Sequence, residues 1–324
     1  MKRHAFLTTT MALGLGVVAT LAGAETPPLE QKDSYKVGFA QMESNNPWRI
    51  AETKSFHDTA ASCSWELIAT DAAGSAAKQV ADVDSMIAQG IDVLFLPPRE
   101  EKPLIPAVKK AKAAGIPVFL VDRSVDEAVA KPGEDFVAFL GSDFVEQGKT
   151  AAEWLIENFD GEKATIVELE GTTGSSPAND RRKGFDDRIS EDDRFEIVAS
   201  QSGDFARDQG RQVMETLLQA HPDVNVVYAH NDEMALGAIQ ALELAGRKPG
   251  EDVTVVSIDG TRDALQAIAD GKMGVTVESS PFFGPLACDV MKRYASGEEI
   301  PGWVKVEDRV FTKDNAADHI DEAY

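Results

Sequence analysis

The sequence is poor in cysteine, in histidine and in basic residues. Its 324 residues include two cysteines and five histidines, and 32 Lys and Arg stand against 55 Asp and Glu, for a formal net charge of −23. Such an acidic chain is unsuited to nucleic acid, because phosphates are held by Lys and Arg, and it is equally unsuited to anionic lipid. We interpret the excess negative charge as a source of solubility.

The two cysteines, Cys63 and Cys288, show no metal-binding pattern, since neither CxxC spacing nor a histidine partner spacing is present. The helices predicted to carry them start at Pro47 and Pro281. If both helices start at one level, Cys63 lies about four turns along its helix and Cys288 about two turns along the other. We therefore favour two thiols at different heights over a disulfide, which an exported chain would permit. No metal or cofactor is expected.

Nothing in the sequence forms a recognisable catalytic motif. After the first 24 residues the histidines are His57, His221, His230 and His319. They show no HExxH spacing, and no G-x-S-x-G elbow is present. Carboxylates such as Asp122, Asp232 and Asp259 could form an acid–base pair, but binding sites also use carboxylates. Without an activated nucleophile, binding is favoured over catalysis.

The first 24 residues predict a secretory signal peptide. A basic head, Met1 to His4, precedes an apolar run from Ala5 to Leu21 and the small residues Ala22-Gly23-Ala24. This order is typical of a signal peptide cleaved after Ala24. The alternative of a membrane anchor is less favoured, because the run is short and broken by glycine. No later stretch reaches the length of a membrane helix, so we expect an exported, soluble mature chain.

Apolar strands and helices alternate twice along the chain, which predicts an α/β fold of two doubly wound parallel-sheet domains. The first series of predicted strands is Tyr35–Gln41, Trp65–Ala69, Val93–Leu96, Pro117–Val121 and Phe136–Leu140. The second series is Thr165–Leu169, Glu196–Ala199, Val224–Ala229, Thr254–Ile258 and Gly274–Val277, with a last strand at Val304–Phe311. Helices are expected between the strands, because parallel strands need such crossovers.

Polar and aromatic residues follow six of these strands. The candidates are Asn46, Trp48, Arg49, Asp122, Arg123, Arg181, Phe205, Asn231 and Asp259, with Ser44, Asn45, Ser142, Asn179 and Ser279 as weaker ones. In open α/β sheets ligands bind at the carboxyl ends of strands. Fixed amide, carboxylate and guanidinium groups suit the hydroxyls of a sugar, and aromatic rings suit its less polar face.

Each candidate also has a structural explanation. Asp259 before Gly260 is a common turn pair, and Asn231 could cap a helix. Asp122 and Arg123 could form a simple ion pair, and Trp48 could belong to the core. The functional interpretation is favoured because polar groups recur at six strand ends that would face one cleft.

Several segments of the chain resemble one protein family. They are NNPWR, VFLVDRS, ELEGTTGSSPANDRRKGF, SQSGDF, YAHNDEMALGAIQAL and VVSIDG. In combination these resemble the type I periplasmic sugar-binding proteins of ABC importers, the ribose- and galactose-binding group, over essentially the whole mature sequence. SQSGDF, YAHND and DRRKGF are most similar to the galactofuranose-binding members.

The resemblance implies two lobes joined by three hinge crossings, near Gly141, Glu278 and Val306. The expected lobes are residues 33–141 plus 279–305 and residues 142–278 plus 306–324. It implies stacking of Trp48 and Phe205 on a sugar ring, and hydrogen bonds to its hydroxyls from Asn46, Asp122, Arg123, Arg181, Asn231 and Asp259. It also implies a periplasmic monomer whose partners are a monosaccharide and a membrane permease with its ATPase.

Three departures from the ribose-binding pattern bear on the ligand. Arg49 replaces a second aromatic residue, which favours a more polar ligand face. Pro97-Pro98 replaces an amide, which disfavours ribose, and Glu278-Ser279-Ser280 replaces the usual Gln or Asn at a hinge crossing. A furanose such as galactofuranose or arabinofuranose is the leading expectation, followed by galactose or arabinose. A periplasmic sugar sensor for a chemoreceptor or kinase is the alternative function.

Overall fold

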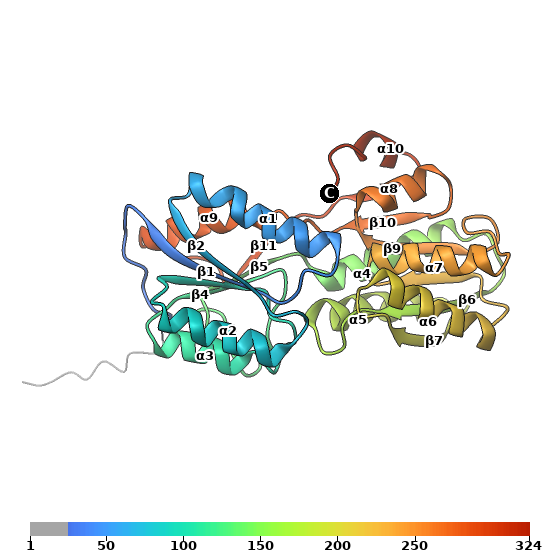
Figure 1. The fold of residues 1–324 in the computed structure, drawn as a ribbon. Coiled ribbons are helices and arrows are strands. Elements are labelled where there is room, and N and C mark those ends of the chain that lie inside the picture. The colour runs from blue at the N-terminus through green and yellow to red at the C-terminus, as the bar shows by residue number, and fades with distance from the viewer. Residues whose placement is uncertain (1–24) are drawn as a thin grey trace, which may run out of the picture.

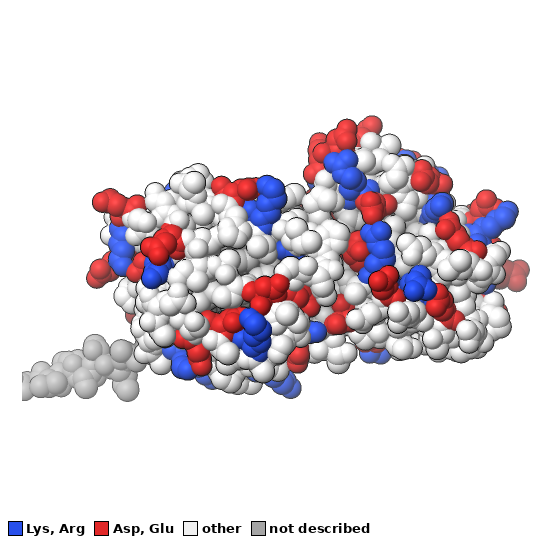
Figure 2. Space-filling model, viewed as in Figure 1, with Lys and Arg blue, Asp and Glu red and all other residues white. Residues whose placement is uncertain are grey.

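The structure is a computed structural model that describes residues 25–324 (Figure 1). The predicted signal peptide, residues 1–24, lies outside the described residues. Across residues 25–324, no helix combines the length and the apolar character needed to cross a membrane. On the face drawn in Figure 2, acidic and basic side chains are interspersed over both lobes, and basic residues form no extended patch there.

The first lobe is built on a six-stranded sheet with strand order β11-β5-β4-β3-β1-β2, and every neighbouring pair is parallel. Its strands are β1 (Tyr35–Gln41), β2 (Trp65–Asp71), β3 (Val93–Leu96), β4 (Val118–Val121), β5 (Ala138–Gly141) and β11 (Trp303–Lys305). Its helices are α1 (Pro47–Ser62), α2 (Ala76–Ala88), α3 (Ile105–Ala113) and α9 (Phe283–Ala295). Helices α1 and α9 cover one face of the sheet, and α2 and α3 cover the other (Figure 1).

The second lobe repeats the plan with strand order β12-β10-β9-β8-β6-β7, in which only the edge strand β12 is antiparallel to its neighbour. Its strands are β6 (Ala164–Glu170), β7 (Phe195–Ser202), β8 (Val226–Ala229), β9 (Thr254–Asp259), β10 (Val275–Glu278) and β12 (Val310–Thr312). Its helices are α4 (Phe144–Asn158), α5 (Ser176–Ile189), α6 (Arg207–Ala220), α7 (Asp232–Leu244), α8 (Arg262–Ala269) and α10 (Ala316–His319).

The chain crosses between the lobes three times, after β5, after β10 and between β11 and β12. The predicted fold class is therefore confirmed. The single last strand expected at Val304–Phe311 is wrong, because β11 pairs with β5 in one sheet and β12 pairs with β10 in the other. Apolar residues recur at Val304, Val306 and Val310, with Asp308 as the one interruption, and such a pattern does not specify the partner strand.

The central strands are buried on both faces, which explains their unbroken apolar sequences. All four residues of β3 (VLFL), β4 (VFLV) and β8 (VVYA) are buried. Aromatic stacking joins helix to sheet in both lobes, with Phe39 and Phe56 centroids 4.0 Å apart and Phe185 and Tyr228 centroids 3.7 Å apart. These cores fix the strands whose carboxyl ends carry the candidate residues.

Cys63 and Cys288 form a disulfide, with their Cα atoms 6.1 Å apart, so the favoured expectation of two free thiols is wrong. The error lies in the assumed level of the two helices. The Gly284 amide donates to Ser55 Oγ at 2.9 Å, so α9 begins beside the middle of α1, about two turns beyond Pro47. This offset brings the two cysteines within bridging distance.

Candidate ligand-binding site

A cavity lies between the lobes, where the carboxyl ends of both sheets meet. Its lining residues are Asn46, Trp48, Arg49, Asp122, Arg123, Pro177, Arg181, Phe205, Asn231, Asp259 and Ser279. All nine stronger candidates and Ser279 therefore lie around one space. Pro177, in the first turn of α5, is the lining residue that the strand-end pattern missed.

The first turn of α1 contributes three residues to the cavity. Asn46 caps the helix by accepting a hydrogen bond from the Arg49 amide at 2.9 Å, and Pro47 occupies a first-turn position that needs no amide hydrogen. Trp48 Nε1 donates to the Ser279 carbonyl at 2.7 Å, next to a hinge crossing. This bond fixes the indole ring against the wall of the cavity.

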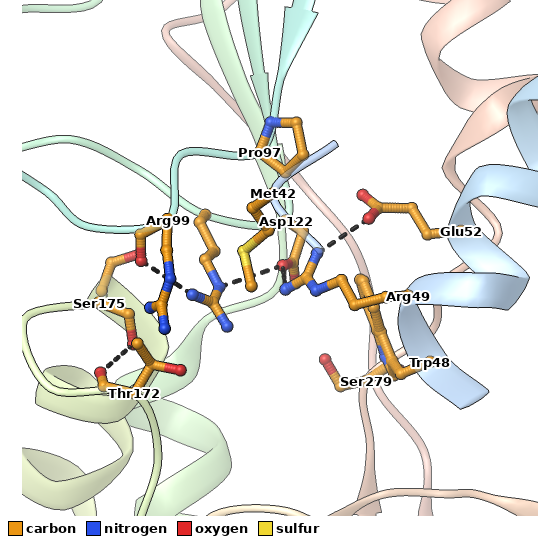
Figure 3. Close-up of polar contacts among 12 residues, drawn as sticks. Met42, Trp48, Arg49, Glu52, Pro97, Arg99, Asp122, Thr172, Ser175 and Ser279 are labelled. Carbon is orange, nitrogen blue, oxygen red and sulfur yellow. Dashed lines mark hydrogen bonds and ion pairs between the residues drawn. The ribbon is translucent and has the colours of Figure 1, made fainter. Parts of the chain in front are cut away.

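Arg49 lies between two carboxylates on the same lobe, Glu52 and Asp122 (Figure 3). Its Nη1 is 2.8 Å from Glu52 Oε2, and its Nη2 forms an ion pair with Asp122. Burial lowers the pKa of Arg49, but the charges of Asp122 and Glu52 outweigh burial and the net shift is upward. Burial raises the pKa of Glu52 to about 7, against the opposing effect of Arg49. The guanidinium is thus held in place without a ligand.

Asp122 and Arg123 follow β4 directly. Asp122 has a φ of 58°, and its amide donates to the Leu140 carbonyl at 2.9 Å. Aspartate adopts this left-handed conformation at a lower cost than most side chains, because its short polar group can form local hydrogen bonds. Arg123 Nη1 donates to the Arg99 carbonyl at 2.9 Å, whereas its buried Nε has no hydrogen-bond partner among the described residues. Burial, followed by the charge of Arg49, lowers the pKa of Arg123 to about 9.

Arg181 on α5 is the corresponding cation of the second lobe. Helices α4 and α5 approach closely because Gly148 and Gly184 lack side chains; a Cβ on Gly148 would lie 2.2 Å from the Arg181 carbonyl oxygen. Arg181 Nε donates to Gln147 Oε1 at 2.9 Å, and its Nη1 donates to the His230 carbonyl at 2.6 Å. Neutral acceptors therefore hold this guanidinium, and its Nη2 lies 3.5 Å from Asp259 Oδ1.

The remaining residues of the second wall lie at the carboxyl ends of three strands, β7, β8 and β9. Asn231 caps α7 through the Met234 amide at 3.1 Å and donates from Nδ2 to the Phe205 carbonyl at 3.2 Å. Asn231 therefore caps a helix and also lines the cavity. Phe205 has a φ of 58° and packs over Gly171, where a Cβ would lie 1.9 Å from the ring. Burial raises the pKa of Asp259 well above its usual range, opposed by Arg181.

Four weaker candidates do not line the cavity. Ser44 donates to Asp71, and Asn45 Oδ1 accepts from Asn46 Nδ2 at 3.1 Å. Ser142 donates to Asp308 at 2.8 Å, next to the crossing after β5. Asn179 Nδ2 donates to Glu101 Oε2 across the two lobes at 3.1 Å. These side chains are occupied by partners within the chain.

The two lobes touch each other beside the cavity. Ser124 donates from its amide to Ser176 Oγ at 2.9 Å, and the Glu101 amide donates to the Gly174 carbonyl at 3.0 Å. An ion pair of 3.6 Å joins Arg99 to Asp204. The structure therefore has the closed arrangement, in which residues of both lobes surround the cavity.

The chemistry of the lining suits a small polyhydroxylated compound. It offers guanidinium and amide donors, carboxylate acceptors and the faces of Trp48 and Phe205. Among residues 25–324, no group of three or more His, Cys, Asp or Glu side chains is arranged to hold a metal ion. Glu52, beneath the cavity, could have been found from the sequence, because it lies one helical turn after Arg49 on the same helix face.

Comparisons with known proteins assign the family. The model of the periplasmic binding protein domain matches residues 37–299. The chain belongs to this family. It is 38% identical to the galactofuranose-binding protein YtfQ of Escherichia coli, over 82% of this chain and 83% of that protein.

Two solved structures of the same fold carry furanoses. One is a protein of Mycobacterium smegmatis in complex with β-D-fucofuranose, with a TM-score of 0.84 and 40% identity over 88% of this chain and 94% of that one. The other is the periplasmic binding protein of an arabinose ABC transporter from Shewanella, bound to α- and β-L-arabinofuranose. Its TM-score is 0.84 at 37% identity, covering 89% of this chain and 95% of that one.

Proposed function

We propose that this protein is the substrate-binding component of an ABC importer and holds one monosaccharide in its furanose form between the lobes. The observation that carries the proposal is the shared cavity, in which each lobe supplies an aromatic ring, a guanidinium and a carboxylate. A sugar ring lies between Trp48 and Phe205, and its hydroxyls bond to the fixed polar groups of both walls. Because both walls contribute, the bound sugar stabilises the closed arrangement.

The size and polarity of the cavity support a single polar sugar. The lobes already touch beside the cavity, which leaves little room for a longer saccharide. Arg49 faces the cavity with its guanidinium 4.4 Å from the centre of the Trp48 ring, so this side offers charged donors beside one aromatic face. The ring of a furanose can stack on the aromatic face, and its exocyclic hydroxyls, which extend beyond the small ring, can accept hydrogen bonds from the charged donors.

The relatives support the choice of ring form. Three of them are named for furanoses, namely galactofuranose, β-D-fucofuranose and L-arabinofuranose. We propose galactofuranose or arabinofuranose for this chain, with galactose or arabinose as the next candidates. Other relatives are import binding proteins for ribose, which favours transport over the sensor alternative.

Several further properties belong to the same proposal. The protein is exported to the periplasm after removal of residues 1–24, acts as a monomer without cofactor or catalytic activity, and delivers sugar to a membrane permease with its ATPase. The lobes correspond to residues 33–141 plus 279–305 and residues 142–278 plus 306–324. The residues assigned to the ligand are Asn46, Trp48, Arg49, Asp122, Arg123, Arg181, Phe205, Asn231 and Asp259, with Ser279 as a weaker candidate.

The test is calorimetric titration of the purified mature protein with ring-locked sugars. Methyl furanosides and methyl pyranosides of galactose and arabinose do not interconvert, so each reports one ring form, and the free sugars complete the panel. We expect binding to at least one furanoside with much weaker binding of the matching pyranoside. Arg181→Ala should abolish most of this binding, whereas Arg182→Ala, a half-exposed neighbour on the same helix, should not. Absence of binding to every sugar would contradict the proposal.

A further inference from the structure

The last five residues of the chain, 320–324, form a tail segment that returns from α10 across α8 to the junction of the lobes. Figure 1 marks this end of the chain with C, between the two lobes. The Arg262 amide at the start of α8 donates to the Tyr324 carbonyl oxygen at 3.0 Å. The Arg262 guanidinium donates to the Asp321 side chain at 3.3 Å and to the Ala323 carbonyl at 3.4 Å. The backbone of the tail segment is thus anchored to the second lobe.

The side chain of Tyr324 contacts the other lobe. Its ring is perpendicular to the ring of Phe282, with centroids 6.1 Å apart. Phe282 directly precedes α9 and follows the crossing after β10. Tyr324 also packs against the core cluster of the first lobe that contains Trp48 and Phe283. Tyr324 therefore connects the tail segment, which is bound to the second lobe, with the hydrophobic cluster that contains Trp48 in the first lobe.

The phenol of Tyr324 lies in the electrostatic field of the cavity wall. Its hydroxyl is buried and has no hydrogen-bond partner among residues 25–324. Burial, and then the charges of Asp259 and Asp232, raise the pKa of Tyr324 well above its usual range. Asp259 lines the cavity, so Tyr324 lies close enough to influence the site without being one of its lining residues.

We propose that Tyr324 is a positioning residue for ligand binding, which favours the closed arrangement by linking α8 of one lobe to Phe282 and the Trp48 cluster of the other. The physical reason is that rotation of the lobes about the crossings moves Phe282 relative to Arg262. A ring that packs on one lobe while its backbone is bound to the other loses contact when the lobes separate. The link to sugar affinity rests on the proposed function, whereas the link to lobe closure does not.

The test compares Tyr324→Ala with Tyr324→Phe. Asp318→Ala, which changes an exposed residue of α10, is the control. Distances between the lobes are measured by double electron–electron resonance between spin labels on α2 and α6. The measurement is made first on the protein without sugar. Tyr324→Ala should shift the distance distribution toward the separated state, while Tyr324→Phe, which keeps the ring, and the control should not. Loss of the ring contact should weaken sugar affinity by roughly 3- to 10-fold, through a faster dissociation rate.

A second variant keeps the proposal testable if Tyr324→Ala does not fold. Arg262→Gln retains the ring and the amide but removes the guanidinium bonds to the tail segment, and it should shift the distances in the same direction. Unchanged distances in both variants would overturn the proposal, as would a shift toward closure. If the unmodified protein binds no sugar, the proposed function fails, and the ligand-free distances still decide the role of Tyr324.

Discussion

The two walls of the cavity hold their charged groups in different ways. In the first lobe, Arg49 is bonded to both Asp122 and Glu52, so its cation is neutralised within the wall. In the second lobe, Arg181 is held by the neutral Gln147 side chain and a backbone carbonyl. The nearest carboxylate oxygen, on Asp259, lies 3.5 Å from the guanidinium.

The difference assigns separate tasks to the two aspartates. Asp122 mainly keeps two buried guanidiniums from facing each other without a counter-charge, so its removal disrupts a wall that exists before the ligand arrives. Asp259 is bound less tightly by its own lobe, and it is available to accept a ligand hydroxyl. The first wall is also braced by the disulfide between Cys63 and Cys288, which ties α1 to α9. We therefore expect a rigid first wall and a second wall that the ligand completes.

The largest expected effect is the loss of stability when the disulfide of the first lobe is removed. The double variant Cys63→Ser with Cys288→Ser should lose about 2–4 kcal/mol of stability, because the bridge closes a long loop. Differential scanning calorimetry should show the first lobe melting earlier while the second is unchanged. A variant that melts like the unmodified protein would show that the disulfide does not stiffen this wall.

Asp122→Ala should weaken sugar binding by at least about 2 kcal/mol, or about 30-fold, because it leaves Arg49 and Arg123 buried without their shared carboxylate. Calorimetric titration measures this loss. Asp71→Ala is the matched control, since Asp71 ends the edge strand β2 of the same sheet and does not line the cavity. Unchanged affinity in Asp122→Ala would remove Asp122 from the site.

Glu52 should make stability depend on pH. Its pKa is raised to about 7 by burial, so the folded protein holds this proton more tightly than the unfolded chain does. The resulting stabilisation is complete below about pH 4.5 and is lost as the pH rises through about 7. Relative to Glu52→Gln, the unmodified protein should lose on the order of 1–3 kcal/mol over this range.

Urea unfolding at a series of pH values measures that difference, and other titrating groups cancel between the two proteins. Glu66→Gln, an exposed glutamate on β2, is the control and should give a curve parallel to that of the unmodified protein. Parallel curves for Glu52→Gln as well would contradict the assigned shift.

Asp259→Asn should have the smallest effect on affinity, about 1 kcal/mol, because the amide keeps an acceptor oxygen and Arg181 retains its neutral partners. The same change at position 122 should cost more, since Asp122→Asn leaves two cations facing a neutral group. Titration of both variants with one sugar compares the walls directly. A larger loss at position 259 would reverse the assignment of tasks.

Strand periodicity predicted the fold and most of the cavity. Six apolar runs end where hydrogen-bonding residues begin, so the sequence alone places Asp122, Asn231 and Asp259 at the carboxyl ends of strands in the two sheets. The same logic included Ser142 and Asn179, which also follow strands or begin helices but bond to Asp308 and Glu101 instead. Sequence adjacency to a strand end does not specify the direction of a side chain.

The features that were not predicted depend on the relative placement of distant elements. Predicting the disulfide would require knowing where α9 begins along the length of α1. The hydrogen bond between Gly284 and Ser55 sets that position. The last predicted strand is in fact two strands, β11 and β12, which pair with different sheets. Predicting this would require knowing which edge strand of each sheet still lacks a neighbour. Tyr324 follows an acidic stretch without apolar periodicity, and its position between the lobes becomes visible only in the folded chain.

The central claim is that one sugar is held by both walls together. A crystal structure of the protein with the sugar that binds most tightly in the titrations tests this directly. We predict a furanose ring between Trp48 and Phe205, with hydroxyls bonded to Arg49 or Asp122 on one side and to Arg181, Asn231 or Asp259 on the other. A sugar bound outside this cavity, or one that contacts a single lobe, would contradict the claim.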